Sequence, residues 1–156
     1  MIEIIRTDSS NPDFIALVKD LDAFLALIDG EEHLFYAQFN QTNKLNYVVV
    51  VYENNKPIGC GALKEYAQNT LEIKRMYTAP DSRGKGIATQ VLAELELWAA
   101  ELYCQKFVLE TGIRQQEAIR LYKKSGYKRI PNYDQYAGIE NSICFEKELK
   151  LYYFKI

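Results

Sequence analysis

The sequence has no apolar run long enough to cross a membrane, and its opening residues, MIEIIR, are not those of a signal peptide. It also has no excess of basic residues, because it contains 19 lysines and arginines and 21 aspartates and glutamates, which gives a formal net charge of −2. Proteins that bind nucleic acids usually carry a basic surface, so this balance argues against a nucleic acid partner. We expect a cytoplasmic protein with no membrane or nucleic acid partner.

Cysteine and histidine are scarce as well. The three cysteines, Cys60, Cys104 and Cys144, lie far apart among apolar neighbours, with neither the spacing of metal ligands nor that of a disulfide framework. The one histidine, His33, is expected on a helix surface rather than in catalysis. The sequence therefore predicts no metal cofactor.

What the chain does contain suits one globular domain over residues 1–156. The composition is 48% hydrophobic and 26% charged, and there is no linker, internal repeat or low-complexity tract. An antiparallel meander followed by a strand–helix–strand half predicts a mixed sheet. From the hydrophobic periodicity, strands are expected at 2–6, 46–52, 58–66, 71–78, 106–110, 127–130 and 142–149, helices at 12–29, 87–102 and 115–125, and a short helix or ordered loop at 31–40.

The stretch 71–102 organises the chain. It begins with a strand that alternates apolar and polar residues, as a half-buried strand does, and continues through Arg83-Gly84-Lys85-Gly86 into a long amphipathic helix. The first amides of a helix lack internal partners, and the helix dipole adds positive potential there. Gly84 and Gly86 have no Cβ, so a phosphate can approach the backbone closely. This junction predicts a pyrophosphate-binding loop.

Two other glycine-rich phosphate loops fit less well. A Walker-type loop needs serine or threonine after the lysine, and Lys85 is followed by Gly86. A dinucleotide fingerprint would have an apolar strand that runs straight into the first glycine. Here the strand carries Glu72 and other charges, and five residues separate Tyr77 from Arg83. A protein that binds NAD remains a minor alternative.

Three motifs in order carry a family resemblance. They are Glu-Ile-Lys-Arg-Met-Tyr-Thr at 72–78, Arg-Gly-Lys-Gly-Ile-Ala at 83–88, and Glu-Ala-Ile-Arg-Leu-Tyr-Lys-Lys-Ser-Gly-Tyr at 117–127. The second matches the Arg/Gln-x-x-Gly-x-Gly/Ala signature of the GNAT superfamily of N-acetyltransferases. The chain resembles that superfamily over residues 48–149.

The resemblance implies an α/β (α+β) fold and a coenzyme. The fold would be a mixed, mostly antiparallel sheet flanked by about four helices, with central strands 71–78 and 106–110 splayed apart. The coenzyme would be acetyl-CoA, the acetyl donor. Gln115 stands where the family often has a coenzyme-binding asparagine. The other implied coenzyme contacts are the amides of Met76, Tyr77 and Thr78 on the pantetheine arm, and Arg83, Gly84, Lys85, Gly86, Ile87, Ala88 and Thr89 on the pyrophosphate.

Acyl transfer to an amine needs a proton acceptor, because an alkylamine with a pKa near 10.4 is neutral in roughly one molecule per thousand at pH 7. Glu72 is the candidate base, acting through water, and a strand carboxylate that is solvated or forms a salt bridge with Lys74 or Arg75 is an equally open interpretation. The resemblance implies that Tyr122 is the general acid that protonates the departing thiolate. The alternative for Tyr122 is a packed core aromatic.

The acceptor is expected near the loop 131–138, where Tyr133 and Tyr136 are candidate substrate contacts and Asp134 would favour a cationic amine. A packed surface loop is the alternative. The sequence thus predicts direct attack by a primary amine of a small molecule or peptide on acetyl-CoA in a ternary complex. A non-catalytic acyl-CoA sensor is the second hypothesis, and the aromatic tail 150–156 is compatible with a homodimer.

Overall fold

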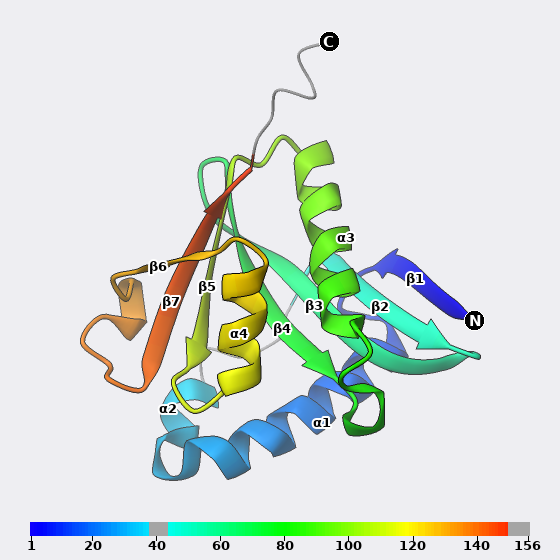
Figure 1. Ribbon diagram of the computed structural model, residues 1–156, viewed down its shortest axis with the longest axis horizontal. Helices are drawn as coiled ribbons and strands as arrows, with labels where there is room; N and C mark the ends of the chain where they lie inside the picture. The colour runs from blue at the N-terminus through cyan, green and yellow to red at the C-terminus, as the bar shows by residue number, and fades with distance from the viewer. Residues whose placement is uncertain (38–43, 150–156) are drawn as a thin grey trace. The chain divides into compact units, whose positions relative to one another are not determined.

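The computed structural model describes residues 1–37 and 44–149. Seven strands form one mixed sheet in the order β1-β2-β3-β4-β5-β7-β6, and Figure 1 shows the course of the elements along the chain. The predicted fold class, a mostly antiparallel sheet with four α-helices, is confirmed. The strands are β1 (Ile2–Thr7), β2 (Tyr47–Glu53), β3 (Lys56–Ala67), β4 (Thr70–Thr78), β5 (Lys106–Gly112), β6 (Lys128–Ile130) and β7 (Ser142–Glu148). The helices are α1 (Pro12–Asp29), α2 (His33–Ala37), α3 (Ile87–Glu101) and α4 (Gln116–Lys124), with 3₁₀ turns η1 (Gly30–Glu32), η2 (Pro80–Ser82) and η3 (Asp134–Tyr136).

The chain divides into two compact units. The first unit comprises Met1–Lys64 and Lys74–Leu95, and the second comprises Glu65–Ile73 and Glu96–Ile156. The single domain expected over residues 1–156 stays a prediction. Among the described residues, no helix is both long and apolar enough to span a membrane.

In the first unit, β1, β2 and β3 form an antiparallel meander. Helix α1 begins where the sequence places its start: the Asn11 side chain accepts hydrogen bonds from the backbone amides of Asp13 and Phe14, and Pro12 occupies the first turn. The apolar face of α1 packs on the meander, because both surfaces leave water when they meet. The core cluster comprises Phe14, Leu17, Val18, Leu45, Val48, Val50, Cys60 and Ala62.

A close approach of backbone to side chain fixes where α3 begins. A Cβ on Gly59 of β3 would lie 2.7 Å from the Ile87 Cγ2 atom and 3.4 Å from the Tyr77 carbonyl oxygen. Only a residue without a side chain fits there. The first residue of α3 therefore rests on β3 beside the end of β4.

In the second unit, the first three residues of β4 pair in parallel with the start of β5. Residues 70–72 pair with residues 106–108, and among the described residues no further β4–β5 pair follows, although β4 runs to Thr78 and β5 to Gly112. Strand β5 instead continues its antiparallel pairing with β7 along its whole length. The end of this ladder after residue 72 is what the predicted splay of the two central strands requires.

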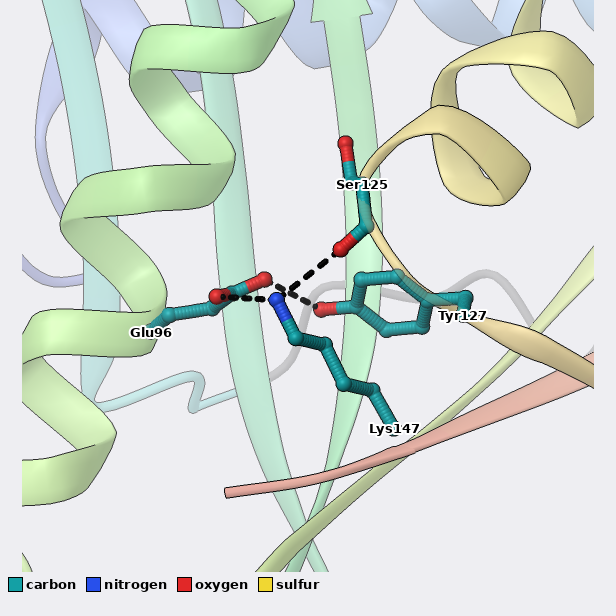
Figure 2. A network of polar contacts seen from close by, with 4 residues as sticks. All are labelled: Glu96, Ser125, Tyr127 and Lys147. Carbon is teal, nitrogen blue, oxygen red and sulfur yellow. Dashed lines mark hydrogen bonds and ion pairs between the residues drawn. The ribbon is translucent and has the colours of Figure 1, made fainter. Parts of the chain in front are cut away.

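A polar network ties α3, β7 and the turn after α4 together in the second unit (Figure 2). The Lys147 ammonium donates to Glu96 Oε1 at 2.8 Å and to the Ser125 carbonyl at 2.9 Å, and the Tyr127 hydroxyl donates to Glu96 Oε2 at 2.9 Å. The Lys147 ammonium also lies 5.5 Å from the centre of the Tyr127 ring. A cation beside the carbonyls that follow α4 stabilises that helix end.

Three sequence expectations need correction. The half-buried alternation of β4 is wrong, because Glu72 and Ile73 are both buried and Arg75, with φ of +59°, interrupts the pleat. The loop 131–138 contains the 3₁₀ turn η3. Leu102, expected on the buried face of α3, lies beyond the end of that helix and is exposed. The tail 150–156 and the end of the expected element 31–40 fall outside the described residues.

Candidate active site

The predicted phosphate-binding loop joins η2 to α3 in the first unit. Gly84 and Gly86 both have φ of +78°, a left-handed conformation that favours glycine. No heavy atom lies within 4 Å of the position that a Cβ would take at either residue. Because the first helical amides have no intrahelical acceptor, those of Ile87, Ala88 and Thr89 can donate outward. The loop is therefore a cradle that fits a phosphate group.

Arg83 anchors this loop to the end of β4. Its Nε atom donates to the Thr78 carbonyl at 3.0 Å, and its guanidinium lies 5.0 Å from the Phe24 ring centre and 5.8 Å from that of Tyr77. The arginine is exposed but has a defined place, unlike a freely solvated surface cation. Lys85 is exposed in the same loop. The first unit thus brings two of the predicted cations together with both glycines.

The other coenzyme contacts predicted in the first unit follow one another at the end of β4. Met76, Tyr77 and Thr78 are all half-buried there. Burial is the main reason that the pKa of the Tyr77 hydroxyl is raised. Their backbone lies at the end of β4, beyond the three residue pairs that join this strand to β5.

Glu72 is a buried carboxylate in the second unit, with only 5% of its surface exposed. The Tyr133 hydroxyl donates to Glu72 Oε2 at 2.6 Å. The interpretation of Glu72 as a solvated carboxylate, or one paired with Lys74 or Arg75, is wrong: no cation among the described residues forms an ion pair with it, and Arg75 pairs with Asp22. The structure thus brings two predicted site residues, Glu72 and Tyr133, into direct contact.

Three tyrosines adjoin this carboxylate and are called the tyrosine cluster (Tyr66, Tyr133 and Tyr136). The ring of Tyr133 meets Tyr66 edge to face at 5.2 Å and Tyr136 edge to face at 5.7 Å. Burial and a hydrogen bond to Asp134 raise the pKa of Tyr66 to about 12. Burial raises the pKa of Tyr133 and Tyr136 as well, and the negative charge of Glu72 adds to both shifts. Tyr133 and Tyr136 of the loop 131–138 therefore turn inward, whereas Pro131, Asp134, Ala137 and Gly138 are exposed.

Glu110 joins the same face of the sheet. Glu72 is paired with Val108 across β4 and β5, and Glu110 is two residues further along β5, so both carboxylates project to one side. Cys144, the β7 partner of Glu110, projects there too, and its pKa is raised to about 11 by burial, with Glu110 and Glu72 adding to the shift.

Sequence reasoning assigned no site role to Tyr66 or Glu110. The available signal for Glu110 was its place at the end of the apolar run Phe107-Val108-Leu109, because charged residues are rare in buried strands. Tyr66 had no comparable signal.

Tyr122 lies in α4 with 5% of its surface exposed. Its ring packs edge to face on Tyr127 at 5.7 Å and tilted against Phe145 at 6.1 Å. Burial, with a smaller contribution from the charge of Glu110, raises the pKa of its hydroxyl, so the phenol is protonated at neutral pH. Tyr122 is thus a core aromatic that also holds a proton it can donate.

Gln115 immediately precedes α4 but does not cap it with its side chain. Its backbone amide donates to the Gly112 carbonyl at 3.0 Å, and its Nε2 atom lies 3.3 Å from the position that a Cβ on Gly112 would take. The side-chain amide thus lies over the end of β5.

Comparison with known proteins agrees with this geometry. The sequence model of the acetyltransferase (GNAT) family matches residues 13–127. A protein named IAA acetyltransferase from Azospirillum brasilense is 27% identical over 95% of this chain and 98% of its own length. A crystal structure from Klebsiella pneumoniae, described as a candidate acyl-CoA N-acyltransferase, superposes with a TM-score of 0.80 at 29% identity and covers 96% of this chain and 99% of that one.

A third likeness concerns a protein solved with its coenzyme. The PaiA N-acetyltransferase from Thermoplasma acidophilum, determined in complex with coenzyme A, has a TM-score of 0.69 at 18% identity, with 96% of this chain and 99% of that chain covered. At that identity the likeness shows the fold alone. The family match, which spans most of the sequence, decides the assignment: the chain belongs to the GNAT acetyltransferase family.

Proposed function

We propose that the protein transfers the acetyl group of acetyl-CoA to a primary amine of a small molecule or peptide, by direct attack within a ternary complex. Membership of the family supports the reaction class. The observation that carries the proposal is the cradle at Gly84 and Gly86, which has a left-handed backbone, open space in front of it and the start of α3 behind it.

The residues of this chain fit such a coenzyme. The pyrophosphate would be held by the first amides of α3 and by Arg83 and Lys85, since a helix start and two cations all favour an anion. The backbone amides of residues 76–78 would pair with the pantetheine arm, and the Gln115 amide would contact the coenzyme. When bound, acetyl-CoA supplies a thioester, an acetyl group already activated for attack by an amine.

Glu72 is assigned the removal of a proton from the acceptor. The acceptor arrives mostly as an ammonium ion, because alkylamines have a pKa near 10.4. Glu72, directly or through one water, breaks an N–H bond of that ion and leaves the nitrogen lone pair available for attack. The hydrogen bond from Tyr133 fixes the orientation of the carboxylate for this step.

Tyr122 is assigned the opposite proton transfer. Because burial raises the pKa of its hydroxyl, Tyr122 keeps its proton at neutral pH and acts as a donor, never as a base. A phenol donor toward a departing thiolate stabilises the negative charge on sulfur and supplies the proton that sulfur gains.

The test is thiol release from acetyl-CoA, followed with a thiol-reactive dye, against a panel of amino acids, diamines, arylalkylamines and short peptides. Wild type is compared with Tyr122→Phe and with Tyr103→Phe, an exposed tyrosine in the same unit. We expect turnover with at least one class of amine, and a fall in kcat of about a hundredfold in Tyr122→Phe alone, the size typical of a lost general acid. Tight coenzyme A binding without turnover on any amine would instead favour the acyl-CoA sensor.

A further inference from the structure

The starting observation is that Glu72 is buried and forms no ion pair with a cation in the part of the chain that the structure describes. Only 5% of this residue is exposed, and the one hydrogen bond that it accepts within residues 1–37 and 44–149 comes from the neutral hydroxyl of Tyr133. A buried charge is costly unless it is paired, and one neutral donor offsets only part of that cost. Within the described residues, the charge of the Glu72 carboxylate is therefore only partly offset.

The neighbouring groups add negative charge rather than offset it. The charge of Glu72 raises the pKa of both Tyr133 and Tyr136, and the charge of Glu110 also raises that of Tyr136. Asp134 and Glu72 raise the pKa of Tyr66 in the same way, and Glu110 and Glu72 raise that of Cys144. Within residues 1–37 and 44–149, no lysine or arginine contributes to these four pKa shifts. Glu72, Glu110 and Asp134 thus place negative charge next to the tyrosine cluster, and negative charge attracts a cation and repels an anion.

The tyrosine cluster supplies the second half of a cation site. Tyr133 packs edge to face on both Tyr66 and Tyr136, so two aromatic neighbours position its ring. Aromatic faces attract ammonium groups through their quadrupole, and their apolar surface suits the carbon skeleton of an amine. Tyr66 remains more than one-third exposed, so the cluster reaches the surface of the second unit.

We propose that the acceptor is a small organic cation whose amine has no neighbouring carboxylate, bound with its ammonium group at Glu72 and its carbon skeleton against the tyrosine cluster. The inference rests on the proposed acetyl transfer and names the class of acceptor for it. Diamines and arylalkylamines meet the condition. Free α-amino acids do not, because their carboxylate would be brought within a few ångströms of Glu72 in a site of low dielectric.

The experiment uses three acceptors with one skeleton: phenethylamine, L-phenylalaninol and L-phenylalanine. The last two have nearly the same size, and the alcohol differs from the amino acid by the absence of the carboxylate. We expect kcat/KM for L-phenylalaninol to lie within about threefold of that for phenethylamine, and kcat/KM for L-phenylalanine to be at least tenfold lower. Equal use of the alcohol and the amino acid would overturn the proposal while leaving acetyl transfer intact.

Two variants connect the preference to Glu72. Glu72→Gln keeps the shape of the side chain and removes its charge, so the ratio of kcat/KM between L-phenylalaninol and L-phenylalanine should fall toward one, whatever the absolute rate. Glu148→Gln removes an exposed carboxylate at the end of β7 and should leave the ratio unchanged. A ratio that persists in Glu72→Gln would assign the preference to another group and refute the proposal.

A binding measurement separates this inference from the proposed reaction. If no amine is acetylated, thermal shifts of the wild-type protein with the same three compounds and coenzyme A decide the matter. Stabilisation by phenethylamine and L-phenylalaninol but not by L-phenylalanine would support the cation site even though the proposed transfer failed. Equal shifts with all three, or none with any, would overturn it.

Discussion

A methyl group added at Gly86 tests the phosphate cradle more directly than removal of a charge does. The substitution Gly86→Ala meets no neighbouring atom within 4 Å, so it causes no clash inside the protein. Its intrinsic cost comes from φ of +78°, because an L-residue in the left-handed region is destabilised by about 1–2 kcal/mol. We expect the unfolding free energy to fall by about that amount.

The effect on coenzyme binding should be larger than the effect on folding. The new methyl group would occupy the space through which a phosphate oxygen reaches the first amides of α3. A hydrogen bond to a charged group contributes about 1.5–3 kcal/mol, and 1.4 kcal/mol corresponds to a factor of ten in Kd. Losing one such bond therefore predicts that coenzyme A binds about ten- to a hundredfold more weakly to Gly86→Ala.

A matched control separates strain from the loss of the phosphate contact. Gly30, just after α1, also has positive φ, +56°, and no atom within 4 Å of its Cβ position. Gly30→Ala should lose at least as much stability in thermal unfolding, because φ of 56° with ψ of −122° is a conformation that favours glycine, and it should bind coenzyme A as the wild type does in calorimetric titration. Wild-type affinity in Gly86→Ala, or an equal loss in both variants, would refute the assignment of this loop to phosphate binding.

Three further predictions concern the frame around the site. Gly59→Ala should destabilise the protein by about 1–3 kcal/mol and weaken coenzyme A binding, because its Cβ would lie 2.7 Å from the Ile87 side chain. Urea unfolding and calorimetric titration measure the two effects, and no change in either would show that Ile87 moves aside at little cost. Lys147→Met should cost about 1–3 kcal/mol by unpairing the half-buried Glu96, and the double variant with Glu96→Gln should recover part of it in thermal unfolding. Burial raises the pKa of Cys60 from near 9 to about 12, so the unfolded chain loses the thiol proton at lower pH than the folded protein does. The free energy of unfolding should therefore decline as pH rises from about 9 to 12, and it should decline less steeply in Cys60→Ala.

The local elements of this fold are readable from the sequence because their causes are local. The start of α1 follows from Asn11 and Pro12, whose side chain and fixed φ act within one helical turn. The turn between β2 and β3 uses Asn54 and Asn55, with φ of 50° and 69°, and asparagine tolerates that region better than most residues. Gly84 and Gly86 of the phosphate loop are likewise a local signal, because glycine favours the positive φ that both residues adopt.

The contacts that define the acceptor side were not readable in this way. Tyr133 reaches Glu72 across 61 positions of the sequence, and Arg75 reaches Asp22 across 53. No periodicity encodes such a pair, because each depends on how distant elements pack. The sequence shows only that charged residues interrupt an apolar strand. This pattern is compatible both with a solvent-exposed strand and with a buried site.

The burial of β4 resolves that ambiguity. In a regular strand, residues 72 and 73 face opposite sides of the sheet, so the burial of both shows that both faces are covered at this point. Both are buried here, and at Arg75 the chain leaves the regular pleat with φ of +59°. A residue with positive φ inside a strand changes the directions in which the side chains after it point. In β4 it lies between Glu72, the last residue paired with β5, and the residues proposed to bind the pantetheine arm. Glu72 and Arg75 each meet a side chain from a distant part of their own unit, Tyr133 and Asp22, and alternation of residue types cannot reveal such contacts.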